Sequence, residues 1–222
     1  MAVIMDGNGR WAERRGLPVA EGHRAGTKAL RRTVEAAIDV GIESLAVYAF
    51  STENWTRPPD EVADLMAIFT ETIDRELPDL SAQGVRTRFI GRRDRAPEEL
   101  RRKMEETEAA TAANERLQLW IAFDYGGRAE LVDAARALVA DGVAPDDVDE
   151  DALRARLYAP EMPDPDLLVR TSGEERISNF LLWQVAYSEL VFVDALWPDF
   201  GEDDLRAALD EYVGRRRRFG GR

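Results

Sequence analysis

Short runs of apolar residues alternate along the chain with longer segments in which apolar positions recur every three or four residues. The short runs predict six β-strands, at residues 2–5, 45–50, 85–90, 117–123, 167–169 and 190–193. The longer segments predict helices at residues 22–40, 59–82, 97–113, 128–140, 150–158 and 202–216. Several strands are apolar nearly throughout, which is typical of parallel strands covered on both faces. The alternation predicts a single domain over residues 1–222, an open, mostly parallel six-stranded α/β sheet flanked by helices.

Four of the predicted strands are followed by clusters of polar, glycine and arginine residues. The clusters lie at residues 6–11, 51–58, 124–128 and 170–179. In open parallel sheets, ligands bind beyond the carboxyl ends of the strands, which all lie along one edge. The clusters therefore predict that function is concentrated at one edge of the sheet.

The first cluster follows the first strand directly and reads Asp6-Gly7-Asn8-Gly9-Arg10-Trp11. Two glycines around one asparagine allow backbone N–H groups to turn toward anionic oxygens. Arg10 adds positive charge, and Asp6 at the strand end could hold Mg²⁺ against the same anion. We therefore predict a diphosphate-binding loop with Asp6 as its reactive carboxylate, the alternative being an ordinary strand-to-helix turn. The sequence contains no Gly-Lys-Ser/Thr, so ATP hydrolysis is not expected.

The second cluster places Ser51 and Asn54 three residues apart on a short turn, so that their polar ends can converge on one point. Trp55 would supply an apolar wall and Arg57 a positive charge. The alternative is a turn closed by its own side-chain caps before the helix that starts near Pro58.

The cluster at residues 170–179 has Arg170 and Arg176 on either side of a glycine turn, with Ser178 two residues further on. Two guanidinium groups and a hydroxyl can clamp a second anion. Alternatively, Glu174 or Glu175 neutralises these arginines in a structural network.

Lone polar or apolar features leave further alternatives open. His23 lies near the start of the first predicted helix, where it could donate to a phosphate oxygen or serve only the structure. The apolar helix face of residues 62–69, continued by Ile73 and Leu77, could be plain core or one wall of a tunnel for an apolar tail. The basic segment 215–221 could be a free tail or could reach the site of a partner subunit.

Composition excludes several kinds of protein. The chain has no Cys and a single His, which excludes disulfides, thiolate metal sites and multi-histidine zinc sites. A formal net charge of −13 argues against broad binding of nucleic acid, which requires a positive field. No apolar run reaches the roughly 18 to 20 residues that span a bilayer, and no signal peptide is visible. We expect a cytoplasmic protein with no nucleic-acid partner.

Taken together, these segments resemble the cis-prenyltransferases, in particular the undecaprenyl diphosphate synthase type. The resemblance extends from Met5 to Gly221. It is carried by Met5-Asp6-Gly7-Asn8-Gly9-Arg10-Trp11-Ala12, Gly22-His23-Arg24-Ala25-Gly26, Tyr48-Ala49-Phe50-Ser51-Thr52-Glu53-Asn54-Trp55, Tyr125-Gly126-Gly127-Arg128, Arg170-Thr171-Ser172-Gly173-Glu174, Arg176-Ile177-Ser178-Asn179-Phe180, Glu189, Leu196-Trp197-Pro198-Asp199-Phe200 and Arg217-Arg218-Phe219-Gly220.

The resemblance implies an enzyme that elongates an allylic diphosphate, usually farnesyl diphosphate, with isopentenyl diphosphate in Mg²⁺-dependent steps that create Z double bonds. The allylic diphosphate would be bound by Gly7, Asn8, Gly9, Arg10 and His23, and isopentenyl diphosphate by Arg170, Arg176 and Ser178. Further substrate contacts are expected from Trp11, Trp55 and Arg57. Asp6 would bring Mg²⁺, with Glu189 in support, and Ser51 and Asn54 would assist proton removal. The family also implies an apolar tunnel, a homodimer whose C-terminal segment lies near the neighbouring site, and transient membrane-surface contact on product release.

The sequence departs from the family in several places. Members often carry an arginine where this chain has Val19, which puts the preferred allylic starter in doubt. Phe123 is bulkier than the residue in many bacterial members and would shorten the product if it faced the tunnel, whereas the small Ala49 keeps the entrance open. The chain starts only a few residues before its first strand, so we expect the usual N-terminal segment to be absent or removed. Product length and the end use of the lipid are not fixed by these features.

Two other functions remain alternatives. A short-chain or branched-product relative, of farnesyl- or lavandulyl-type, would share the binding loops, although Ser51 with Asn54 favours ordinary elongation. A non-catalytic partner subunit of the same fold is disfavoured because Asp6, Asn54 and Arg170 are all present.

Overall fold

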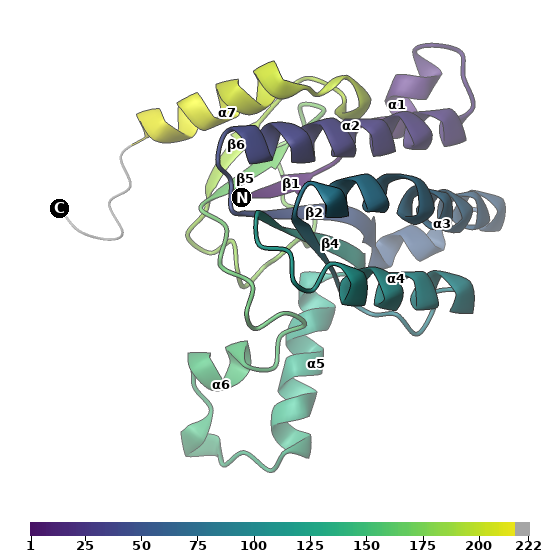
Figure 1. Ribbon diagram of the computed structural model, residues 1–222. Helices are drawn as coiled ribbons and strands as arrows, with labels where there is room; N and C mark the ends of the chain where they lie inside the picture. Colours follow the sequence, from purple (N-terminus) through teal and green to yellow (C-terminus); the bar gives the residue numbers. More distant parts are fainter. Residues whose placement is uncertain (216–222) are drawn as a thin grey trace.

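The computed structural model describes residues 1–215, and its core is one twisted sheet (Figure 1). The strands are β1 (Ala2–Ile4), β2 (Ser44–Ser51), β3 (Val85–Ile90), β4 (Leu117–Tyr125), β5 (Leu167–Arg170) and β6 (Glu189–Phe192). They are ordered β3-β4-β2-β1-β5-β6, and each neighbouring pair is parallel. The predicted six-stranded α/β sheet is confirmed, and it is parallel throughout. All carboxyl ends of the strands consequently lie along one edge.

Helices cover the sheet unevenly. The α-helices are α1 (Asn8–Glu13), α2 (Val19–Asp39), α3 (Pro59–Ala82), α4 (Glu98–Ala110), α5 (Gly127–Ala140), α6 (Glu150–Arg154) and α7 (Glu202–Gly214). Three short 3₁₀ helices are η1 (Thr52–Thr56), η2 (Pro145–Asp147) and η3 (Trp197–Asp199). Helices α7, α2, α3 and α4 lie side by side in one layer, whereas α5 and α6 lie together on the other side of the sheet (Figure 1). Within residues 1–215, no helix is both long and apolar enough to cross a membrane.

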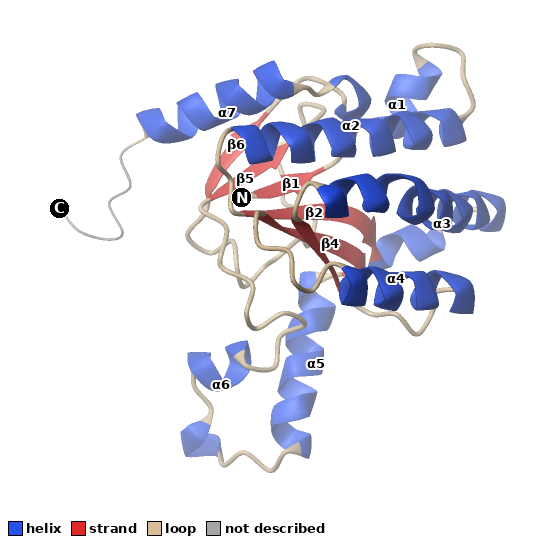
Figure 2. Cartoon of the chain, in the orientation of Figure 1, coloured by secondary structure: helices blue, strands red, loops and turns tan. Residues whose placement is uncertain are grey.

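The alternation of side chains along the strands divides the core in two. In β1, Val3 belongs to the cluster beneath the layer of α2, α3, α4 and α7, while Ala2 and Ile4 belong to the cluster on the opposite face. The opposite cluster is completed by Phe180 and Leu181, which come from irregular chain between β5 and β6 (Figure 2). Both faces are therefore buried, which explains why the strands read as continuous apolar runs.

The observed helices differ from the predicted ones in where some of them end and in one additional helix. Helix α3 matches the prediction, but α6 ends at Arg154 rather than at residue 158, and residue 216 of the last predicted helix lies outside the described residues. Helix α1 was not predicted, because six residues that include Gly9 show no apolar period. It starts directly after Gly7, whose φ of 108° is unfavourable for other residues.

Glycines in α2 let it approach α1 and η3 closely. A Cβ at Gly22 would overlap the backbone carbonyl of Asn8, and a Cβ at Gly26 would overlap the Asn8 side chain. The carbonyl of Gly26 also accepts a hydrogen bond of 2.9 Å from the Trp197 indole. Trp197 in turn donates its backbone N–H to the carbonyl of Asp6 at 2.9 Å. Two sequence motifs thus meet at the end of β1 and fix the position of Asp6.

We predict that Gly22→Ala destabilises the protein, because its methyl group has no space against Asn8. Overpacking of this kind costs about 1–3 kcal/mol of unfolding free energy. Thermal unfolding measures the loss. Gly214→Ala in α7 is the matched control, because an added Cβ there meets nothing within 4 Å. Equal stability of the two variants would contradict the close approach of α1 and α2.

Candidate active site

The carboxyl edge of the sheet carries a polar pocket built from residues that are far apart in the sequence. Its wall includes six residues predicted to be functional, from β1, the β2–η1 turn and the segment after β5; these are Asp6, Ser51, Asn54, Arg170, Arg176 and Ser178. The fold assembles them because the carboxyl ends of β2, β1 and β5 are adjacent in the sheet. With Arg57, which lines the same pocket, the structure brings together one carboxylate, three guanidinium groups, two hydroxyls and one side-chain amide.

The centre of this pocket is an ion pair between Asp6 and Arg170. Arg170 is 4% exposed, and its Nη2 lies 2.8 Å from Oδ2 of Asp6. Its Nη1 donates to Oγ of Ser178 at 2.7 Å and to the carbonyl of Arg176. Among the described residues, the buried Nε of Arg170 has no hydrogen-bond partner. The guanidinium group therefore orders the chain around Ser178 and keeps one donor free.

Asp6 is held ionised by its surroundings. Partial burial raises the pKa of Asp6, but the hydrogen bond and charge of Arg170 and the charge of Arg10 outweigh burial, so the net pKa lies below its usual value. The backbone of Asp6 is fixed by Thr171, whose Oγ1 accepts the Asp6 N–H at 2.9 Å and donates to the Asp6 carbonyl at 2.7 Å. Asp6 thus presents a carboxylate, not a carboxylic acid.

Glu174 neutralises the exposed arginines, as one alternative from the sequence proposed. It lies 3.4 Å from Nη1 of Arg10 and forms an ion pair with Arg176, whose side chain is 60% exposed. Such exposed pairs contribute only about 0–1 kcal/mol. An entering anion with several oxygens can therefore replace the Glu174 carboxylate at little cost, so the network does not exclude anion binding.

Ser51 and Asn54 do converge, but on each other. The Ser51 N–H donates to Oδ1 of Asn54 at 2.9 Å, and the side chain of Ser51 accepts the Asn54 backbone N–H. This reciprocal capping closes η1, as the structural alternative proposed. The Ser51 hydroxyl also makes side-chain hydrogen bonds with Glu53 and Tyr48, and both Ser51 and Asn54 line the pocket wall. The two readings of this turn are therefore compatible.

A second polar pocket adjoins the first and contains most of the first motif. It is lined by Met5, Asp6, Gly7, Asn8, Gly9, Arg10, Val19, His23, Arg57 and Glu61. Burial and the charge of Arg57 lower the pKa of His23, Glu61 opposes the decrease, and the net value is about 4. A neutral imidazole has one N–H to donate. Val19 lies on this wall, so the family's usual arginine position does face the pocket.

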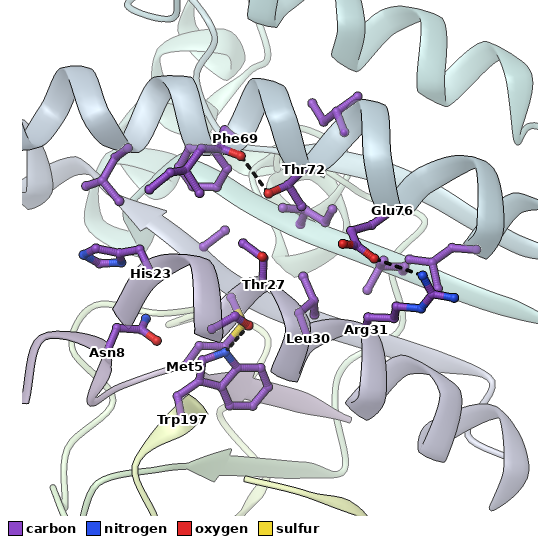
Figure 3. Close-up of a pocket in the computed structure, with 18 of the residues that line it drawn as sticks. Met5, Asn8, His23, Thr27, Leu30, Arg31, Phe69, Thr72, Glu76 and Trp197 are labelled. Carbon is purple, nitrogen blue, oxygen red and sulfur yellow. Dashed lines mark hydrogen bonds and ion pairs between the residues drawn. The ribbon is translucent and has the colours of Figure 1, made fainter. Parts of the chain in front are cut away.

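An apolar pocket runs from these polar pockets beneath α2 and α3 (Figure 3). Leu30 of α2 and Phe69 of α3 line its sides, and Arg31 and Glu76, 3.2 Å apart, lie at its far end. Met5, Asn8 and His23 line all three pockets. They therefore mark a junction at which a charged compartment meets an apolar one.

The two residues expected to affect the apolar channel have different positions. Ala49 lines both the apolar pocket and the first polar pocket, at their junction. Phe123 does not line the apolar pocket; it packs between Phe50 and Phe69, with ring centroids 5.5 and 5.3 Å away. Its bulk therefore fills the core and leaves the pocket wall unchanged.

Three predicted site residues lie away from the polar pockets. Trp11 donates its indole N–H to Asp199 at 2.6 Å, and Trp55 donates to Asp124 at 2.8 Å. Glu189 begins β6, level with Leu167 at the start of β5, so it lies at the opposite edge of the sheet from Arg170. There it forms an ion pair of 2.9 Å with Arg215. Within one chain the structure does not bring Glu189 to Asp6, and residues 1–215 contain no cluster of three carboxylate or imidazole groups suited to a metal.

Sequence reasoning missed residues that support the turn carrying Asn54. Asp124 is fully buried, accepts from Trp55 and forms a two-point ion pair with Arg95. Asn179 donates to Glu53 at 3.0 Å. The only signals in the sequence were the position of Asp124 at the end of a predicted apolar strand and of Asn179 inside a motif, and neither signal identifies a hydrogen-bond partner.

Two anion pockets that share one wall with an apolar pocket define a protein that binds molecules with a charged head and an apolar body. A family model described as putative undecaprenyl diphosphate synthase matches residues 4–220. The chain belongs to this family, which confirms the resemblance found in the sequence.

Relatives and solved structures agree over nearly the whole chain. A (2E,6E)-farnesyl-diphosphate-specific ditrans,polycis-undecaprenyl-diphosphate synthase of Xanthomonas axonopodis pv. citri is 51% identical, over 99% of this chain and 87% of that protein. An isoprenyl transferase of Thermotoga maritima is 48% identical, over 100% of this chain and 96% of its own. The crystal structure of lavandulyl diphosphate synthase from Lavandula x intermedia in complex with dimethylallyl diphosphate has a TM-score of 0.95 at 38% identity. The match covers 99% of this chain and 96% of that chain. A probable undecaprenyl diphosphate synthase from Campylobacter jejuni has a TM-score of 0.83 at 31% identity, with the same coverage.

We predict that the imidazole of His23 titrates near pH 4 instead of its usual 6.5. Because the unfolded chain takes up this proton at higher pH, the stability contributed by neutral His23 is fully present above pH 6.5 and is lost as the pH falls toward 4. The chain has one histidine, so a single imidazole resonance in an NMR titration reports it directly. A midpoint at or above the usual value would contradict the burial of this ring.

Proposed function

We propose that the protein is an isoprenyl transferase that condenses isopentenyl diphosphate with an allylic diphosphate, with farnesyl diphosphate as the expected starter. The product is a Z-configured polyprenyl diphosphate of the undecaprenyl type, a precursor of carrier lipids. The names of the bacterial relatives support this activity. The observation that carries it is the junction at Met5, Asn8 and His23, where two polar pockets open onto one apolar pocket. Two diphosphates and one hydrocarbon chain need such an arrangement.

Each diphosphate is assigned to one pocket. The allylic diphosphate occupies the pocket of residues 7–10 and His23, from which its apolar chain enters the apolar pocket, which we propose to be the start of a tunnel. Isopentenyl diphosphate occupies the pocket of Arg170, Arg176 and Ser178. Arginines give these anions charge-assisted, two-point hydrogen bonds.

Mg²⁺ is proposed at Asp6. Proteins bind this ion through one or two carboxylates together with substrate phosphates, and Asp6 is an ionised carboxylate on the wall of both polar pockets. When bound, Mg²⁺ would supply positive charge against the departing diphosphate. Glu189, which lies at the other edge of the sheet, does not belong to this site within one chain.

The residues of the chain have separate roles in the proposed reaction. A bond forms between the terminal alkene carbon of isopentenyl diphosphate and the allylic carbon, while the allylic C–O bond breaks and the diphosphate leaves with its electron pair. Arg10 and His23 stabilise that leaving anion. Ser51 and Asn54 orient isopentenyl diphosphate so that it loses one proton to the departing diphosphate, which completes the new double bond. The apolar pocket keeps water from the cationic carbon.

Assembly and location complete the proposal. A homodimer at the cytoplasmic side of the membrane, with transient contact of the product with the membrane surface, fits an enzyme whose product is a lipid. The arginine-rich segment predicted to reach a neighbouring site begins at Arg215, and residues 216–221 lie outside the described residues. A branched-product activity is the second candidate, because the plant enzyme named for lavandulyl diphosphate has the TM-score of 0.95.

Incubation with Mg²⁺, farnesyl diphosphate and labelled isopentenyl diphosphate should give chain-elongated products, sized by chromatography. We predict that Asp6→Asn lowers turnover by about 100-fold or more, since it removes one charge aimed at the reacting diphosphates. Asparagine is preferable to alanine, because Arg170 is 4% exposed and needs an acceptor. Lack of incorporation by the wild-type protein with any allylic starter would overturn the proposed function, and a normal rate for Asp6→Asn would remove Asp6 from it.

We also predict that Val19→Arg lowers the KM for the allylic diphosphate, because residue 19 lies on the wall of the allylic pocket and an arginine adds a two-point donor. One added charged hydrogen bond corresponds to roughly a tenfold change. The KM for isopentenyl diphosphate, measured in parallel, should stay unchanged. An equal change in both constants would assign residue 19 to general electrostatics instead of to the allylic pocket.

A further inference from the structure

The turn that carries Asn54 is anchored through the residues on both sides of it. On one side, Trp55 donates to the buried carboxylate of Asp124 at 2.8 Å. On the other side, Oε1 of Glu53 accepts a hydrogen bond of 3.0 Å from Nδ2 of Asn179. The position of Asn54 therefore depends on two contacts outside its own turn.

Asn179 makes three hydrogen bonds, to two separate segments. Besides the bond to Glu53, its side-chain Oδ1 accepts the backbone N–H of Arg128 at 2.8 Å, and its carbonyl accepts the N–H of Gly127 at 2.7 Å. These N–H groups belong to the first residues of α5, which have no partner inside the helix. Asn179 thus caps α5 from a distant part of the chain and leaves Nδ2 for η1.

The glycine motif before α5 makes room for this contact. An added Cβ at Gly126 would lie 2.6 Å from Oγ1 of Thr52 and 2.9 Å from Nδ2 of Asn179. Asn179 itself has a φ of 65°, a left-handed conformation that asparagine tolerates better than most residues. This packing explains Gly126 in the motif Tyr125-Gly126-Gly127-Arg128, none of whose residues lines the two polar pockets.

Asn179 also follows Ser178 directly. Ser178 accepts the hydrogen bond from Arg170, and it too has a left-handed φ, of 45°. Two consecutive left-handed residues leave little freedom between the Ser178 hydroxyl and the Asn179 side chain. A displacement of Asn179 is therefore transmitted to Ser178 on one wall of the isopentenyl pocket and to Asn54 on the other.

We propose that Asn179 is a positioning residue that couples the two walls of the isopentenyl diphosphate pocket through its hydrogen bond to Glu53. Asn179 does not line the pocket; it sets the separation between the Ser51–Asn54 turn and the Arg170–Ser178 clamp. The proposal rests on the proposed function, because it assigns isopentenyl diphosphate to that pocket.

The donor and the acceptor of the hydrogen bond between Asn179 and Glu53 can be exchanged by substitution, and this exchange tests the proposal. Asn179→Asp places two carboxylates where the bond was, while the aspartate still accepts the Arg128 N–H. Glu53→Gln alone keeps an acceptor for Asn179 Nδ2. In the double variant, the amide of residue 53 donates to the carboxylate of residue 179, and the bond is restored with donor and acceptor exchanged.

Steady-state kinetics are measured for the wild type, both single variants and the double variant. We expect Asn179→Asp to raise the KM for isopentenyl diphosphate by about tenfold or more, the effect of losing a hydrogen bond to a charged group. The KM for the allylic diphosphate should change by less than about twofold, since the hydrogen bonds of Asn179 do not reach the allylic pocket. Glu53→Gln and the double variant should stay within roughly threefold of the wild type.

Asn114→Asp is the matched control. The side chain of Asn114 also ties separate segments together, donating to the carbonyls of Ser81 and Val85 at 3.1 and 2.9 Å, but at the amino edge of the sheet. The Asn114→Asp substitution should lower the thermal unfolding midpoint without changing the KM for isopentenyl diphosphate or for the allylic diphosphate. If the role of Asn179 were purely structural, Asn179→Asp would likewise lower the unfolding midpoint and leave both KM values unchanged. That result would overturn the inference about Asn179 but not the proposed function. A double variant whose KM for isopentenyl diphosphate does not recover would do the same. Absence of condensation by the wild-type protein would instead overturn the proposed function.

Discussion

The rest of the site depends on the burial of one guanidinium group. Arg170, at the end of β5, is 4% exposed, and a charge removed from water to this extent costs several kcal/mol unless it is paired. Its partners come from two places: Asp6 at the end of β1, and Ser178 and the Arg176 carbonyl on the segment after β5. The hydrogen bonds that the guanidinium group of Arg170 needs therefore fold the segment after β5 back over the carboxyl edge of the sheet. The same contacts keep Asp6 ionised, so one requirement determines both the shape and the charge of the pocket.

The second constraint is the close approach of α1 and α2. Gly22 and Gly26 allow Asn8 to lie against α2, and His23 follows Gly22 on the same helix. Asn8 and His23 consequently reach the point where the polar pockets meet the apolar pocket. The boundary between polar and apolar surroundings is thus set by backbone packing, which is rigid. A substrate with a diphosphate head and a hydrocarbon chain would be placed by that boundary, since neither part is stable in the other's compartment.

The sequence predicted the features that depend on local pattern. The buried strands and α3 follow from apolar runs and periodicity, and the location of the site follows from the rule that parallel strands end at one edge. Partner choice could not be predicted in the same way. Trp11 and Trp55 look like substrate contacts in the sequence, yet each indole N–H is taken by an aspartate distant in the chain, Asp199 or Asp124. Likewise, Glu189 reads as a metal ligand until the register of β6 shows it at the amino edge.

The position of Glu189 also bears on how a metal could be held. On the carboxyl edge, Asp6 is flanked by Arg170 at 2.8 Å and by Arg10 at 3.4 Å. Two positive charges so near would repel a bare divalent cation, because charges a few ångströms apart interact by about 1–4 kcal/mol each even at a solvated protein surface. In the proposed reaction, Asp6 would therefore hold Mg²⁺ together with a diphosphate, and Arg10 and Arg170 would bind the diphosphate oxygens. In this proposal the substrate would complete the metal site, so that metal binding and substrate binding would be coupled at Asp6.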